Sequence, residues 1–70
     1  MTNTEKKARA LIATLSLKLL VIQFELTEEQ NSEASFMVRG WVMDELERRN
    51  SKAFNAWLDS DIPSPRDFFL

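Results

Sequence analysis

Residues 8–26 carry apolar side chains on two faces of the helix that their spacing predicts. One face collects the positions at i, i+3, i+4 and i+7, which are Ala8, Leu11, Ile12, Leu15, Leu19, Ile22 and Leu26. The opposite face collects Ala10, Ala13, Leu17, Leu20, Val21 and Phe24. A surface helix needs only one apolar stripe to pack on its own domain. We therefore expect a helix over about residues 4–26 that packs on its own chain with one face and on a second chain with the other.

A second helix is predicted over about residues 28–50. The segment 27–30 reads Thr-Glu-Glu-Gln, which has the form of a capping box at a helix start. Asn31 and Ser32 offer a rival start one turn later. The apolar face of this helix consists of Ala34, Met37, Val38, Trp41, Val42 and Leu46.

A short third helix is predicted over about residues 52–59, with Asn50 or Ser51 as its cap. Its single apolar stripe consists of Ala53, Phe54, Trp57 and Leu58. Farther on, Ser-Pro-Arg-Asp at 64–67 places proline at a first helical position and an acid in the first turn. This predicts a final turn over about residues 65–70.

The last three residues, Phe68, Phe69 and Leu70, form an apolar tail. Such a tail either folds back to cover the bundle or docks into a partner. The helix-start signal just before it favours folding back, and the sequence leaves docking open.

Composition places the whole chain in the all-α class. The 70 residues are 44% hydrophobic, with one Gly and two Pro, so residues 1–70 suit a single helical domain. We expect a small helical bundle made of a long helix hairpin, a short third helix and a C-terminal turn. A domain this small has marginal stability, and without Cys or His it has neither disulfides nor a zinc site. Association with another chain is the remaining means of stabilising it.

The sequence offers no site for catalysis, cofactors or metals. Without His or Cys, neither a Ser–His pair nor a cysteine nucleophile is available, and there is no Gly-rich loop. The carboxylate pairs Glu29 with Glu33 and Asp44 with Glu47 fit a solvated helix face. An EF-hand loop starting in the acidic turn at 59–61 would lack both its glycine and its final glutamate. We expect no enzyme, no cofactor and no bound metal.

We also expect no membrane segment and a cytoplasmic location. Arg9, Lys18, Gln23 and Glu25 interrupt the apolar run before it reaches the ~20 residues of a membrane span. The run lacks the small-residue cleavage site of a signal peptide. The absence of Cys fits a reducing compartment.

Glu45 stands out because helical spacing places it inside the apolar arc of the second helix. It either reaches water at the end of the bundle or pairs with a cation across an interface, for which Lys18 and Arg9 are candidates. An unpaired buried carboxylate would be too costly to persist.

The sequence indicates a small non-enzymatic helical protein that acts through protein–protein interaction as a homodimer, and that could also bind another protein. The candidate self-contact set is Ala13, Leu17, Leu20, Val21 and Phe24, although the pattern does not say which face of the first helix turns outward. The alternative is a small nucleic-acid-associated regulator of the repressor or antitoxin type, since basic residues flank the junction of the second and third helices. A net charge of −2 argues against nucleic acid as the partner.

Overall fold

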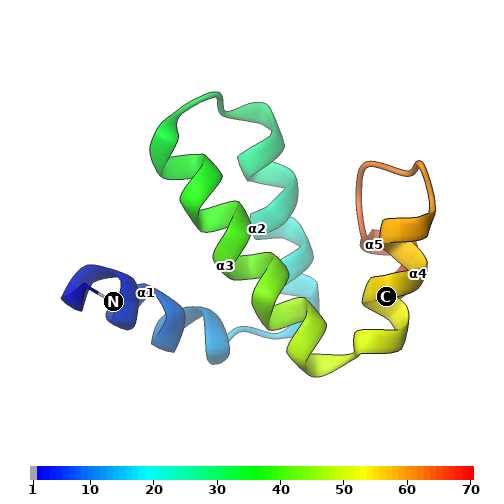
Figure 1. Ribbon diagram of the computed structural model, residues 1–70, viewed down its shortest axis with the longest axis horizontal. Coiled ribbons are helices and arrows are strands. Elements are labelled where there is room, and N and C mark those ends of the chain that lie inside the picture. Colours follow the sequence, from blue (N-terminus) through cyan, green and yellow to red (C-terminus); the bar gives the residue numbers. More distant parts are fainter. Residues whose placement is uncertain (1) are drawn as a thin grey trace.

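The chain folds into an all-α bundle, as its composition predicts. The computed structural model describes residues 2–70, and over these residues it contains helices and no strand. The helices are α1 (Asn3–Ala13), α2 (Leu17–Glu29), α3 (Glu33–Arg49), α4 (Ser51–Asp59) and α5 (Arg66–Phe69). The helices α2 and α3 form an antiparallel hairpin at the centre, α1 runs along one side of its base, and α4 and α5 lie on the other side (Figure 1).

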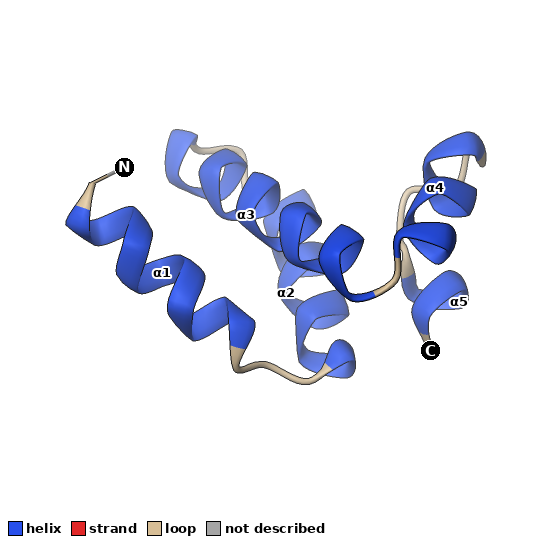
Figure 2. Cartoon of the chain, turned by 60° about the horizontal axis from the view of Figure 1, so that its bottom comes forward, coloured by secondary structure: helices blue, strands red, loops and turns tan. Residues whose placement is uncertain are grey.

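The single helix expected over 4–26 is wrong, because the chain breaks between Ala13 and Leu17. Thr14 ends α1, and its hydroxyl donates to the Leu11 carbonyl at 2.6 Å. Ser16 then adopts an extended backbone, with φ −68° and ψ 161°, and its hydroxyl accepts a hydrogen bond from the Leu19 N–H at 3.2 Å. Both hydroxyls satisfy backbone groups that a continuous helix would pair internally. As a result α1 turns away from α2 at this loop (Figure 2).

The start expected for the second long helix is also wrong, and the rival start at Ser32 is the correct one. Thr27 is buried inside α2, where its hydroxyl donates to the Phe24 carbonyl at 2.6 Å. The capping box belongs to Ser32 and Ser35, since each side chain accepts from the other's backbone N–H at 3.2 Å. The helix therefore spans Glu33–Arg49 in place of 28–50.

The third and final elements lie close to their expected positions. Asn50 caps α4 by accepting from the Ala53 N–H at 3.0 Å, so that helix spans Ser51–Asp59 against an expected 52–59. The final turn, expected over 65–70, is α5 at Arg66–Phe69, which follows Pro65 directly.

The core lies where α2, α3 and α4 meet, and α1 contributes one side chain to it. Its buried members are Ile12, Leu20, Phe24, Val42, Leu46, Phe54 and Trp57. The Trp57 ring packs edge-on against Phe24 at a centroid distance of 5.1 Å and against Phe54 at 5.8 Å. Its indole N–H donates to the Ile62 carbonyl at 2.9 Å, so the segment after α4 is anchored to the core as well.

Within residues 2–70, no helix combines the length and the apolar content that crossing a membrane requires.

Candidate functional site

The inner face of α2 forms part of the core. Leu20 and Val21 have no exposed surface and Phe24 is 4% exposed. These three residues belong to the set expected to contact a second copy, and that expectation is wrong because the chain's own helices already cover them. Of the remaining two, Leu17 is half-buried against the core, and Ala13 is exposed at the end of α1.

The outer face of α2 carries the second apolar stripe. Leu19 is 49% exposed and Leu26 is 47% exposed, while Ile22 between them is half-buried. Their spacing of three and then four residues places all three on one side of the helix, away from Leu20 and Phe24. We call these three residues the outer ridge.

An open groove of about 440 Å³ runs beside the outer ridge, between α1, α2 and α3. Its lining is mostly apolar and consists of Ala8, Leu11, Ile12, Thr14, Leu15, Gln23, Val38 and Trp41. Leu11 is the most exposed of the large apolar side chains, at 69%. Gln23 lies one turn from both Leu19 and Leu26, so the groove and the outer ridge adjoin. Together they form what we call the outer apolar surface.

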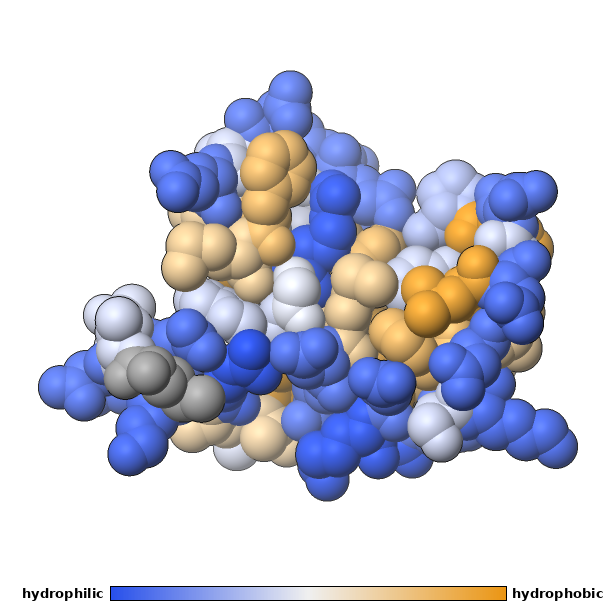
Figure 3. All heavy atoms as spheres, viewed as in Figure 1, coloured by the Kyte–Doolittle hydropathy of each residue, from blue (hydrophilic) through white to orange (hydrophobic). Residues whose placement is uncertain are grey.

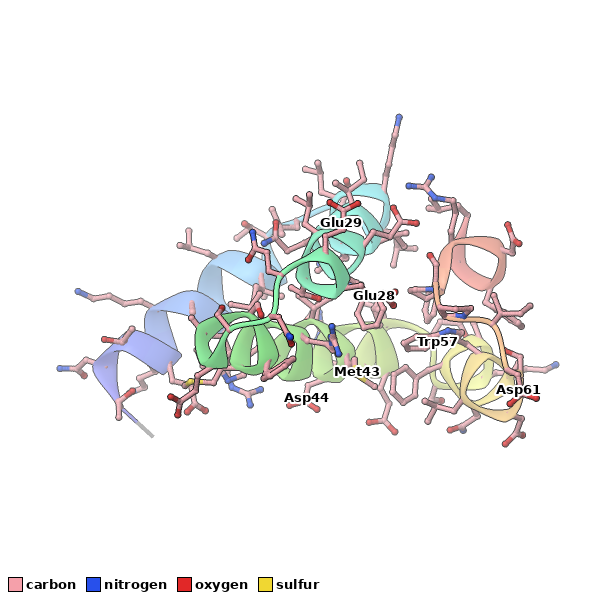
Figure 4. The ribbon with its side chains drawn as sticks, turned by 90° about the horizontal axis from the view of Figure 1, so that it is seen from above. Glu28, Glu29, Met43, Asp44, Trp57 and Asp61 are labelled. Atoms are coloured by element: carbon pink, nitrogen blue, oxygen red, sulfur yellow. The ribbon has the colours of Figure 1, made fainter. Side chains whose placement is uncertain are left out.

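Two opposite charges lie beside the outer ridge. Lys18 is in the first turn of α2 and Glu29 is its last residue, and both side chains are exposed. Neither makes an ion pair with any residue from 2 to 70. Glu29 lies on the side of α2 that faces away from α3 (Figure 4). The outer apolar surface thus has a basic end and an acidic end.

Other apolar side chains are exposed elsewhere, but they lie apart from this surface. Leu58, Ile62 and Leu70 are each about half exposed, on α4 and in the segments that follow it. In the face shown in Figure 3, apolar side chains gather over α4 and α5, whereas hydrophilic ones dominate along α1. Phe36 on α3 is 51% exposed and lies beside the Arg39 guanidinium, 5.5 Å from the centre of its ring.

Glu45 is a buried charge, but it pairs with neither of the expected partners, Lys18 and Arg9. The carboxylate is buried, and its partners are Arg48 and Arg49 of its own helix, with Nε–O distances of 3.0 and 2.7 Å. Hydrogen bonding from Arg48, followed by that from Arg49, lowers the pKa of Glu45 to about 2, although burial opposes the shift. Its expected partner Arg9 instead bonds to Glu5 and Asp44, at 3.0 Å each.

The apolar tail lies against its own chain in the structure. Phe68 and Phe69 are half-buried and pack on the core, whereas Leu70 is 55% exposed. Arg66 donates to both oxygens of Glu25 on α2, at 2.7 and 3.0 Å, and the Ser64 hydroxyl donates to the same carboxylate at 2.8 Å. These bonds, chiefly those from Arg66, lower the pKa of Glu25 to about 2.

Among residues 2–70, no three His, Cys, Asp or Glu side chains are grouped closely enough to hold a metal ion. Every buried side-chain nitrogen or oxygen in this part of the chain has a hydrogen-bond partner. Its buried polar groups are therefore committed to the fold, and the outer apolar surface is the candidate site that remains.

Comparisons with protein-family models, with curated proteins and with solved structures found no match to this chain.

Proposed function

We propose that this chain is a small non-enzymatic helical protein that acts through protein–protein interaction as a homodimer, with the outer apolar surface as the contact. One observation carries the proposal. After the chain has packed its own core, the outer ridge and the adjoining groove remain open to solvent. Contiguous apolar surface of this kind is characteristic of binding faces.

The free energies of burial and of association indicate that the outer ridge and the groove must both be buried in the contact. Burying a leucine or isoleucine side chain fully contributes about 1.5–3 kcal/mol, and the ridge residues are already partly buried. Association costs about 4–15 kcal/mol in lost translational and rotational freedom. The outer ridge alone would barely offset that cost, so we expect the groove to be filled as well. The dimer should be weak enough to dissociate on dilution.

The arginines support a protein partner over nucleic acid. All five form hydrogen bonds within the chain: Arg9 to Glu5 and Asp44, Arg39 to Thr27, Arg48 and Arg49 to Glu45, and Arg66 to Glu25. Binding phosphates would require breaking several of these bonds, because guanidinium groups are the chief donors to a nucleic-acid backbone. A gel-shift assay at low salt tests the alternative, since binding to phosphates weakens steeply as salt is added.

The direct test is absolute mass by light scattering behind a sizing column, over a dilution series. We expect twice the 8.2 kDa chain mass at high concentration and a fall toward 8.2 kDa on dilution. The double variant L19Q/L26Q should be monomeric throughout. L58Q is the matched control, because Leu58 is 52% exposed but lies on α4, away from this surface.

Two outcomes would contradict the proposal. A wild-type chain that is monomeric at every concentration would exclude the homodimer. A dimer that L58Q disrupts and L19Q/L26Q leaves intact would place the contact on α4.

A further inference from the structure

The proposed homodimer leaves open how the two copies face each other, and the charges beside the outer ridge bear on that question. We infer that two copies pack their α2 helices antiparallel across a twofold axis near Ile22, with Lys18 of each copy opposite Glu29 of the other. This inference rests on the proposed homodimer and adds its orientation and register.

The apolar residues of the outer ridge suit an antiparallel arrangement. Leu19 precedes Ile22 by three residues and Leu26 follows it by four, so Ile22 is close to the centre of the ridge. A twofold axis that crosses α2 near this centre exchanges the two ends of the helix. Leu19 of one copy then meets Leu26 of the other, and Ile22 meets its own counterpart.

The charges favour the same arrangement. Lys18 and Glu29 are eleven residues apart, which is about three full turns, so both lie along the same edge of the outer ridge. A twofold axis that lies in the plane of contact and perpendicular to α2 reverses the direction of the helix. It keeps the edge that carries Lys18 and Glu29 on the same side of the contact in both copies. Each Lys18 therefore faces a Glu29. Parallel packing across a twofold axis would instead place this edge of the two copies on opposite sides of the contact, so neither Lys18 would meet a Glu29.

The register that the apolar contacts require and the register that the charge pairs require agree within the reach of a lysine side chain. The midpoint of Lys18 and Glu29 falls between residues 23 and 24, and the ridge is centred near Ile22. The two centres differ by one to one and a half residues, and a twofold axis doubles this difference, so Lys18 and Glu29 are displaced by two to three residues, or about 3–4.5 Å along the helix. Both charges are also free to pair, whereas Glu25 of the same helix is already held by Arg66 and Ser64.

Charge reversal tests the orientation. K18E and E29K should each weaken the dimer by about tenfold at low salt, because each variant turns two attractions into repulsions. The double variant K18E/E29K should recover the wild-type dissociation constant, since it restores both pairs with exchanged signs. An equimolar mixture of the two single variants should form heterodimers, and added salt should reduce all of these effects.

Cysteine cross-linking tests the register, and the chain has no native cysteine to interfere. Under mild oxidation I22C should link to its own copy. L19C and L26C should link to each other when mixed but not to themselves. L58C serves as the control that should remain unlinked. Circular dichroism of each variant checks that it is folded. If I22C does not fold, the cross-link between the exposed positions 19 and 26 still tests the register.

The outcomes separate this inference from the proposed function. A monomeric wild-type chain would overturn both. A second outcome would overturn the antiparallel orientation and leave the proposed homodimer standing. In that case L19Q/L26Q disrupts the dimer, K18E and E29K leave its dissociation constant unchanged, and L19C links to its own copy.

Discussion

Arg49 donates a hydrogen bond to the carbonyl of Ala13, 36 residues earlier in the chain, at 3.0 Å. That carbonyl lies in the last turn of α1, where backbone acceptors have no partner inside the helix and where a cation is favourable. The other end of the same guanidinium bonds to the buried Glu45. One side chain thus joins the end of α1 to α3 and fixes one wall of the groove.

Removing this link should loosen α1. We expect R49A to destabilise the fold by about 1–3 kcal/mol, because the Ala13 carbonyl loses its partner and Glu45 retains only Arg48. Hydrogen exchange should accelerate most in α1. The control is R48A, which also removes a partner from Glu45 but makes no bond to α1. Equal exchange rates in α1 for the two variants would show that the Arg49–Ala13 bond contributes little.

Leu19 and Leu20 are adjacent in α2 and should respond in opposite ways to truncation. L20A should cost about 2–5 kcal/mol in the free energy of unfolding, because Leu20 is fully buried in the core. L19A should change the stability of the monomer by less than about 1 kcal/mol and should instead weaken the dimer. Urea unfolding at low protein concentration, paired with the mass measurement, separates the two effects. Equal losses of stability would contradict the assignment of the two faces of α2.

The break between α1 and α2 should depend on the Ser16 hydroxyl. We expect S16A to lower stability by about 0.5–2 kcal/mol, because the Leu19 N–H then loses its acceptor at the helix start. The Leu19 amide should exchange faster in this variant. S16N, which can still cap the helix, should stay close to the wild-type chain. If S16A is as stable as S16N, the cap does not hold the break in place.

Acid should destabilise the protein between about pH 4.5 and pH 2. The pKa of Glu25 is lowered from 4.5 to about 2 by bonds from Arg66 and Ser64, so the unfolded chain binds more protons than the folded one in this range. The stabilisation is therefore present above pH 4.5 and is lost as the pH falls toward 2. The urea midpoint measured against pH should fall less steeply for E25Q. E28Q, three residues along and without an ion pair, should keep the wild-type slope. Identical slopes for all three chains would exclude a contribution from Glu25.

The fold class was predictable from the sequence because apolar periodicity and the lack of helix breakers are properties of long segments. The break at residues 14–16 was not, since it depends on two hydroxyls that bond to nearby backbone, and Thr and Ser also occur inside helices. The misplaced start of α3 has the same origin, because the Thr27 hydroxyl bonds back to Phe24 in place of capping the next helix.

The candidate surface was predictable only in part. The two stripes of residues 8–26 are equally apolar, so the pattern indicated that one face is open but not which one. The choice depends on tertiary packing, because Trp57 and Phe54 of α4 cover the Phe24 side of α2. The partners of Glu45 did carry a sequence signal, since Arg48 and Arg49 follow it at the i+3 and i+4 spacing of helical ion pairs.

The two tryptophans occupy different environments, so intrinsic fluorescence reports on two events separately. Trp57 (labelled in Figure 4) is 5% exposed and packs against Phe24 and Phe54, whereas Trp41 lines the groove and is half-buried. An indole emits at longer wavelength in contact with water, so unfolding should shift the emission of Trp57 to the red, while filling the groove should shift that of Trp41 to the blue. A chain with Trp57 replaced by Phe would therefore carry a single optical reporter in the groove, without any added label.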